Sequence, residues 1–223
     1  MRSIVYLGHS CFQVRLGNIV MLFNPASADL LGGKKRMQKS GLNPRTVREC
    51  DLIFLSNEDP ANCEPDTVKE ISERAFSSVV APKPALAKIG VSDRFKIDVR
   101  TGDKFSVKGI DIEVVKAVHP QVQYPVGYIV KGDGLTIYHA GDTYSFTDMA
   151  RIKCDVALVP IGGGSVMDPF AANSAVKEMR PKVAVPMCYN TFETIQQDPN
   201  EFVNDLGGLT KGVALKIGQE IRL

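Results

Sequence analysis

Histidine is scarce in this sequence, which limits any site built mainly from imidazole side chains. The 223 residues include only three histidines, His9, His119 and His139. Cysteine is sparse as well: the five present are an odd number, and no two of them form a C-x-x-C pair. That pattern argues against a disulfide framework and is typical of free thiols in a reducing compartment, so we expect a cytoplasmic protein.

Excess charge of either sign is also missing. Twenty-seven Lys and Arg against 25 Asp and Glu leave a formal charge of +2, which disfavours nucleic acid or an acidic membrane surface as partner. The one basic run, at 34–36, is interpreted as a solvated loop. No apolar run approaches the roughly 18 residues that a membrane span needs, and the first residues enter a strand pattern too early for a signal peptide. We therefore expect a small-molecule ligand, with homo-oligomer formation left open.

The sequence does contain two kinds of strand signal. Hairpins are predicted where a glycine-containing turn separates two short apolar stretches, at 11–23, 104–115 and 126–139. A continuous apolar run predicts a strand buried on both faces at 52–55, and a further strand is predicted at 156–159. Closing strands are expected at 213–215 and 220–223, and the polar, glycine-rich stretch 25–49 is interpreted as a long loop with room for one short helix.

Helices are predicted only after each set of strands. Proline at a first-turn position and apolar residues on one face indicate them at 65–76, 169–179 and 199–206. The order of β-rich and then β-α segments thus occurs twice, without a linker between the halves. We expect a single α/β (α+β) domain over residues 1–223, folded as a four-layer αββα sandwich of two mixed sheets with helices outside.

Polar residues with chemical potential follow the ends of predicted strands, where ligands usually bind. They are Asn57, Asp59 and Asn62 after 52–55, His119 after 110–115, His139 and Asp142 after 135–138, and Cys188, Tyr189 and Asn190 after 183–186. Each has a plainer interpretation: a lone histidine there is usually a hydrogen-bonded structural residue, and Cys188 in an apolar setting behaves as a small hydrophobe. The glycines at 162–164 lack the spacing of a phosphate-binding loop.

The order and spacing of these motifs carry a family resemblance over nearly the whole chain. The matching segments are 6–12 (YLGHSCF), 22–25 (LFNP), 126–129 (VGYI), 137–143 (IYHAGDT), 160–164 (PIGGG) and 186–192 (PMCYNTF). Together they resemble the metallo-β-lactamase superfamily, in the branch of L-ascorbate-6-phosphate lactonase and related metal-dependent hydrolases. The resemblance implies an αββα sandwich with a metal site between the loop ends of its sheets.

This sequence departs from the family at the metal ligands. Where the family carries H-x-H-x-D-H, it has Asn57, Asp59, Ala61 and Asn62. The last motif histidine of the family is here Cys188, and the early aspartate is Asn24. The resemblance matches His119 to a ligand histidine and Asp142 to the bridging aspartate, so the implied dinuclear site is degenerate.

The losses differ between the two metal positions that the resemblance implies. The first retains Asp59, His119 and Asp142, an oxygen-rich set suited to one divalent ion, with Mn²⁺, Fe²⁺ or Mg²⁺ favoured over Zn²⁺. The second retains only Asp142 and Cys188. Two-metal hydrolysis needs cations about 3.5–4 Å apart, so we expect one divalent metal at most, or none, and no dinuclear mechanism.

The resemblance also places residues around the metals that do not ligate them. His9 and His139 are expected to line the pocket, and Asn57, Asn62, Tyr189 and Asn190 are further candidates for binding a cofactor or ligand. The alternative for both histidines is a structural role as hydrogen-bonding partners within the fold.

Three functional hypotheses remain. In the first, Asp59, His119 and Asp142 are catalytic and hold one ion, for hydrolysis of a small lactone, ester or phosphorylated substrate. In the second, the chain is a non-catalytic ligand-binding or interaction protein that has lost metal-dependent hydrolysis. In the third, Cys188 is a nucleophile with His119 as its base, against which stands an inert buried thiol.

Overall fold

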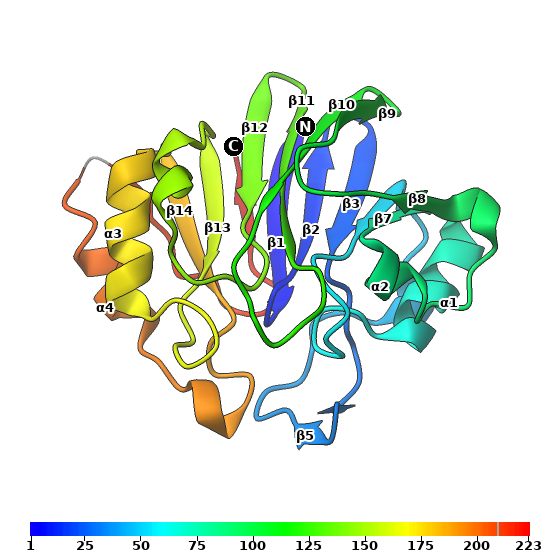
Figure 1. Ribbon diagram of the computed structural model, residues 1–223, viewed down its shortest axis with the longest axis horizontal. Helices are drawn as coiled ribbons and strands as arrows, with labels where there is room; N and C mark the ends of the chain where they lie inside the picture. Colours follow the sequence, from blue (N-terminus) through cyan, green and yellow to red (C-terminus); the bar gives the residue numbers. More distant parts are fainter. Residues whose placement is uncertain (209) are drawn as a thin grey trace.

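Two mixed β-sheets lie face to face at the centre of the computed structural model, which describes residues 1–208 and 210–223 (Figure 1). The first sheet has the order β16-β1-β2-β3-β6-β7-β8. Its strands are β1 (Arg2–Gly8), β2 (Cys11–Leu16), β3 (Ile19–Phe23), β6 (Leu52–Phe54), β7 (Ser78–Ala81), β8 (Lys96–Asp98) and β16 (Glu220–Arg222).

The second sheet has the order β15-β14-β13-β12-β11-β10-β9. Its strands are β9 (Lys104–Val107), β10 (Ile110–Lys116), β11 (Val126–Gly132), β12 (Leu135–His139), β13 (Val156–Pro160), β14 (Val183–Met187) and β15 (Lys211–Gly212). A small separate hairpin pairs β4 (Leu30–Leu31) with β5 (Lys34–Lys35).

The helices cover the outer faces of the two sheets, as Figure 1 shows. They are α1 (Pro65–Ala75) and α2 (Lys83–Leu86) beside the first sheet, and α3 (Pro169–Met179) and α4 (Pro199–Asn204) beside the second. Short 3₁₀ helices are η1 (Pro44–Thr46), η2 (Asp93–Phe95), η3 (Thr147–Arg151) and η4 (Glu193–Ile195). The predicted four-layer αββα sandwich is confirmed.

Turn chemistry decides which strands pair antiparallel. Lys108 and Gly109 link β9 to β10, and Asp133 and Gly134 link β11 to β12, each pair with both residues at positive φ. Such two-residue turns match the natural twist of a hairpin. Where a helix connects strands instead, the pairing is parallel, as between β6 and β7 across α1. The predicted hairpins and buried strands are therefore present.

Strand β6 shows why one of the apolar runs is continuous. Leu52 and Phe54 belong to the core between the two sheets, while Ile53 and Leu55 belong to the cluster that also contains residues of α1 and α2. A strand between two apolar layers has no polar face. Burial on both faces, as predicted, thus holds β6 in place and sets the position from which the polar segment 57–62 begins.

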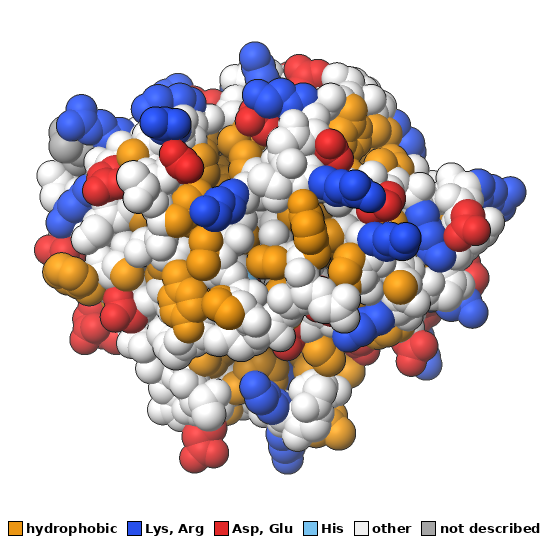
Figure 2. Space-filling model, viewed as in Figure 1, with side chains coloured by type: hydrophobic (Ala, Val, Ile, Leu, Met, Phe, Trp, Pro, Cys, Tyr) orange, Lys and Arg blue, Asp and Glu red, His pale blue; other side chains and the backbone are white. Residues whose placement is uncertain are grey.

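The stretch 25–49 and the strand predicted at 213–215 differ from expectation, whereas the strand predicted at 220–223 is present as β16. The stretch 25–49 contains η1, the one short helix that was allowed for, and also the β4–β5 hairpin, which was not expected. The last strand of the second sheet is β15 at Lys211–Gly212 and not 213–215, although Val213 N–H still bonds Ala184 O at 2.9 Å. Among the described residues, none of the helices has the length and apolar character to cross a membrane. On the face seen in Figure 2, basic and acidic side chains are interspersed among apolar ones.

Aromatic residues join the two sheets close to the site end. Phe23 of β3 stacks on Phe54 of β6 with ring centroids 4.7 Å apart, and Phe54 meets Tyr128 of β11 edge-on at 5.0 Å. The Tyr128 hydroxyl is fully buried and donates to Leu55 O in the opposite sheet at 2.8 Å. This bond ties the end of β6 to the second sheet.

We expect Tyr128→Phe to lower the free energy of unfolding by about 1–3 kcal/mol, because Leu55 O loses a buried donor. Urea unfolding followed by circular dichroism measures the change. Tyr124→Phe is the control: Tyr124 is only partly buried and its hydroxyl accepts from Thr101 N at 3.3 Å, so its effect is expected to stay within about 0.5 kcal/mol. Equal losses for the two variants would contradict the account of this tie.

Candidate functional site

A cavity of about 250 Å³ lies where loops from the two sheets meet. Its lining includes His9, Asp59, His119, Asp142 and Cys188 together with the 163–166 segment. A larger groove of about 660 Å³ lies beside β10, β11 and η3, and none of the predicted site residues lines it. Chemistry therefore points to the smaller cavity, where ionisable side chains converge.

Two strand ends bring His9 and Cys188 together across the molecule. His9 lies in the turn between β1 and β2, Cys188 directly follows β14, and the Cys188 N–H donates to His9 O at 2.9 Å. Both residues have φ of 56°, a left-handed conformation that non-glycine residues adopt at a cost and that clusters at functional sites. Gly162 permits this approach, because a Cβ there would collide with Cys188 O.

Three buried ligand atoms converge at this point. His9, Asp142 and Cys188 each contribute one, and these atoms lie within 4.8 Å of one another. Among the described residues, these three form the group of histidine, cysteine and acidic side chains that could hold a metal ion. The Cys188 thiol donates to Asp142 Oδ1 at 3.4 Å. Burial, followed by the nearby Asp142 charge, raises the pKa of Cys188 well above its ordinary value. Without a cation the thiol is therefore neutral.

The hydrogen bonds of the two cavity histidines leave one ring nitrogen of each free to bind. His119 Nδ1 lies 2.9 Å from Ser165 O, an atom that only accepts, so Nδ1 carries the proton. Its Nε2 lies 3.9 Å from Asp142 Oδ2. His9 Nδ1 lies 3.1 Å from Thr191 Oγ1, whose hydroxyl donates to Tyr189 O at 3.4 Å, so here too Nδ1 is the donor. A partner on Nδ1 that fixes the tautomer is typical of histidines that bind metal through Nε2.

His139 has a different role. Its Nε2 donates to Ser10 O at 2.9 Å, its Nδ1 accepts from Gly141 N–H at 3.2 Å, and its ring stacks on Phe23 at 4.9 Å. Both nitrogens are used and the side chain is buried, outside the cavity lining. These contacts match the structural alternative for His139, while His9 lies in the lining as the pocket interpretation requires.

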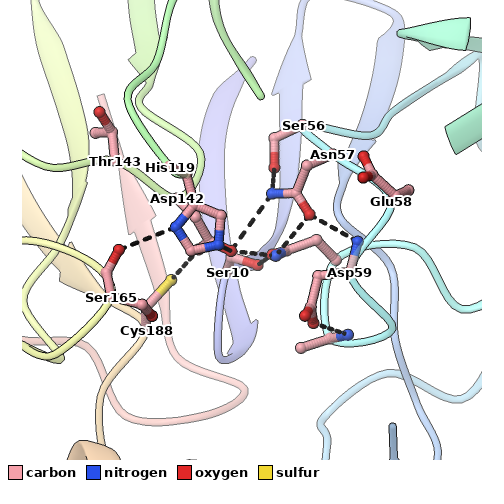
Figure 3. A network of polar contacts seen from close by, with 12 residues as sticks. Ser10, Ser56, Asn57, Glu58, Asp59, His119, Asp142, Thr143, Ser165 and Cys188 are labelled. Atoms are coloured by element: carbon pink, nitrogen blue, oxygen red, sulfur yellow. Dashed lines mark hydrogen bonds and ion pairs between the residues drawn. The ribbon is translucent and has the colours of Figure 1, made fainter. Parts of the chain in front are cut away.

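The predicted residues of the 57–62 segment divide between the cavity and the core (Figure 3). Asp59 lines the cavity, but its Oδ1 accepts from Ala61 N–H at 2.8 Å and it stands outside the 4.8 Å group. Asn57 and Asn62 are fully buried, and each donates an amide N–H to Asp142 Oδ2. Asp59, His119 and Asp142 are thus not gathered as one ligand set.

Tyr189 and Asn190 lie beside the cavity and not in its lining. Tyr189 stacks on Tyr6 with centroids 6.5 Å apart. The Asn190 amide pairs with the Gln197 backbone, donating to its O at 3.0 Å and accepting from its N–H at 2.9 Å. Their contacts shape the loop that carries Cys188.

Two contributors were not foreseen. The basic run 34–36 is not simply a solvated loop: Lys34 lines the cavity, 6.0 Å from the centre of the Phe192 ring. Arg36 is buried and donates to Ala28 O and Ala26 O at 3.0 Å each. The local sequence could not predict that Lys34 lines the cavity, because its position depends on how the β4–β5 hairpin packs against the rest of the fold.

The donor set fits one divalent ion and not two. Imidazole nitrogen, thiolate sulfur and carboxylate oxygen together form an ordinary set for a transition metal. At the other position of the family, Ala61 has no ligand atom, and Asn57 and Asn62 direct amide hydrogens, which cannot ligate, at Asp142. The side chains present therefore do not fit a dinuclear centre.

Comparisons with known proteins agree with this fold. Residues 3–188 match the model of the Beta-lactamase superfamily domain. The UPF0173 metal-dependent hydrolases of Thermococcus kodakarensis and Sulfurisphaera tokodaii are 36% and 33% identical, each over 100% of both chains. The solved structure of Igni18, a metallo hydrolase from Ignicoccus hospitalis, has a TM-score of 0.82 at 29% identity, covering 99% of this chain and 97% of that one. An isothiocyanate hydrolase from Delia radicum gut bacteria shares the fold, with a TM-score of 0.81 at 12% identity and 99% coverage of both chains.

Fold, motif order and cavity thus define a protein of the metallo-β-lactamase superfamily, and the resemblance seen in the sequence is confirmed. More narrowly, the chain belongs to the UPF0173 family, whose members are named metal-dependent hydrolases.

The neutral state of His139 predicts a pH dependence of stability. Burial lowers the pKa of His139 from 6.5 to about 4. The unfolded chain therefore takes up a proton that the folded one refuses, so stability is complete above pH 6.5 and is lost as the pH falls toward 4. The loss amounts to about 3 kcal/mol.

Urea unfolding of wild type and His139→Phe between pH 7.5 and about 4.5 tests this pH dependence. The variant is expected to be less stable at pH 7.5, because Ser10 O loses its donor, yet to lose less stability on acidification. His9, whose pKa burial also lowers to about 4, contributes further pH dependence in both proteins. Parallel pH curves for the two proteins would contradict the assignment.

Proposed function

We propose that this chain is a hydrolase with a single metal ion, held by His9, Asp142 and Cys188 at the floor of the cavity. The observation that carries the proposal is the convergence of those three buried ligand atoms within 4.8 Å. His119, whose Nε2 faces Asp142 Oδ2 at 3.9 Å, is the adjacent group for binding or proton transfer. Membership in a family of proteins named metal-dependent hydrolases supports the same reading.

The donor types favour Zn²⁺ or Fe²⁺ over Mg²⁺. The sequence alone suggested the oxygen-rich set Asp59, His119 and Asp142, whereas the group in the structure has a cysteine sulfur in addition to one imidazole and one carboxylate. Softer ions prefer such a sulfur ligand. Such an ion polarises a carbonyl or phosphoryl oxygen and makes water more acidic. The chain itself fixes the histidine tautomers through Thr191 and Ser165.

The cavity suits a small substrate with an anionic group. Its volume is about 250 Å³, and Lys34 is the lysine in its lining, 6.0 Å from the centre of the Phe192 ring. Gly163 and Gly164, between β13 and α3, also line the cavity. We infer a small phosphorylated, lactone or ester substrate whose negative group pairs with Lys34.

The non-catalytic alternative rests on one specific observation. The amides of Asn57 and Asn62 and the methyl group of Ala61 occupy positions where the family has metal ligands. A scaffold that only binds a small ligand needs no ion there. The cysteine-nucleophile hypothesis finds no support, because burial and Asp142 raise the pKa of Cys188.

Metal content tests the proposal. Protein purified without added metal and then loaded with Zn²⁺ is expected to retain about one equivalent after desalting, and Cys188→Ser to lose at least about tenfold in affinity. Cys154→Ser, which alters a half-buried cysteine that is not in the ligand group, is the control and is expected to bind as wild type does. Zinc bound equally by all three proteins, or by none, would refute the single-ion site.

Substrate charge tests the role of Lys34. In a panel of lactones, carboxylate esters and phosphate monoesters, Lys34→Met is expected to raise KM for an anionic substrate by roughly fivefold with little change in kcat. Lys35→Met is the matched control, because Lys35 is the next residue of β5, is exposed and does not line the cavity. Equal effects of the two substitutions would show that only overall charge matters.

A further inference from the structure

Asp142 is a buried carboxylate, and among the described residues no lysine or arginine forms an ion pair with it. It is 7% exposed, and its neighbours are Asn57, Asn62, His119 and Cys188. A buried charge without compensation is costly. On Oδ2 the compensation comes from amide donors: Asn62 Nδ2 at 2.5 Å and Asn57 Nδ2 at 3.4 Å.

The hydrogen-bond network dictates which way these amides point. Asn62 Oδ1 accepts from the Ser10 hydroxyl and from Asn24 Nδ2, the latter at 3.0 Å. Asn57 Oδ1 accepts from Asp59 N–H at 2.8 Å. With both amide oxygens engaged by donors, the NH₂ groups must face Asp142, so the orientation follows from the partners and not from atom naming.

Asn24 fixes the geometry of this network through its hydrogen bonds to Ser10, Ser56 and Asn62. Its Oδ1 accepts from Ser56 N–H at 2.9 Å, which leaves its Nδ2 to serve Ser10, Ser56 and Asn62. Its own φ of 45° is left-handed, a conformation that asparagine tolerates better than most residues. Amides at 24, 57 and 62 thus form one connected set in which each supports the next.

We propose that Asn57 and Asn62 are positioning residues that take the place of a cation on Asp142. Their N–H dipoles stabilise the carboxylate at Oδ2 and hold it so that Oδ1 faces Cys188. The compensation at Oδ2 stands whether or not an ion binds at Oδ1. Only the presentation of Oδ1 to an ion rests on the proposed function.

A substitution that changes charge but hardly changes shape exposes this role. Asn62→Asp replaces the donor on Oδ2 with a second carboxylate, so two like charges face each other unless a cation joins them. Ca²⁺ is the appropriate probe, because it prefers oxygen ligands and suits a nitrogen and sulfur set poorly. In the wild-type protein the Asn62 amide already donates to Asp142 Oδ2, so Ca²⁺ is not expected to bind there.

Thermal unfolding with EDTA and with millimolar Ca²⁺ measures the difference. We expect Ca²⁺ to raise the Tm of Asn62→Asp by roughly 5 °C, and that of wild type by less than about 1 °C. Asn173→Asp is the matched control: Asn173 is equally buried, its Nδ2 donates to Phe202 O at 2.9 Å, and it lies in α3. That variant is expected to be destabilised without rescue by Ca²⁺.

Asn57→Asp, with the same readout, replaces Asn62→Asp if the latter does not fold. A Ca²⁺ response no larger than that of Asn173→Asp, or a wild-type Tm that falls in EDTA and recovers with Ca²⁺, would overturn the inference. Loss of zinc binding at Cys188 bears on the proposed function alone, so failures of the two proposals are distinguishable.

Discussion

The carboxylate of Asp142 is the group on which the rest of the site depends. Taken out of water between two sheets, it must be met by donors or cations from every side. Its surroundings supply amide N–H groups at Oδ2 and a thiol at Oδ1, with His119 facing the same carboxylate. These neighbours lie in the segments that follow β6, β10 and β14, so the compensation of one charge links loops of both sheets.

This constraint explains why the amides of Asn57 and Asn62 act together on Asp142. The Ser10 hydroxyl and Asn24 Nδ2 fix the orientation of the amide at 62, and Asp59 N–H fixes that of the amide at 57. At positions where the family resemblance implies imidazole ligands of a metal, the amides of Asn57 and Asn62 donate directly to the carboxylate. On the other side, His9 and Cys188 supply a different set of donors around the same aspartate. The central carboxylate thus has amide donors at Oδ2 and the thiol of Cys188 at Oδ1.

Much of the fold was readable from the sequence, because its signals are local. Two-residue turns at Lys108–Gly109 and Asp133–Gly134 specify hairpins, and the uninterrupted apolar run at 52–55 specifies a strand buried on both faces. The strand predicted at 213–215 was misplaced, since β15 has only two residues and depends on backbone pairing with β14 instead of an apolar pattern.

The site was only partly readable, because its geometry depends on packing over long sequence separations. His119 and Asp142 were found from motif order, and the structure places them 3.9 Å apart. That His9 joins Cys188 required the β1–β2 turn to meet the end of β14, which no local pattern encodes. The different fates of His9 and His139 follow from whether a ring nitrogen is left over after hydrogen bonding. Lys34 enters the cavity only because a hairpin folds back.

Cobalt substitution tests the central claim, one ion bound by His9, Asp142 and Cys188, most directly. A thiolate bound to Co²⁺ gives an intense charge-transfer absorption in the near ultraviolet, which carboxylate and imidazole ligands do not. The account predicts that this band rises to saturation at one equivalent of Co²⁺ and is absent in Cys188→Ser. Saturation at two equivalents, or binding of Co²⁺ without the band, would contradict it.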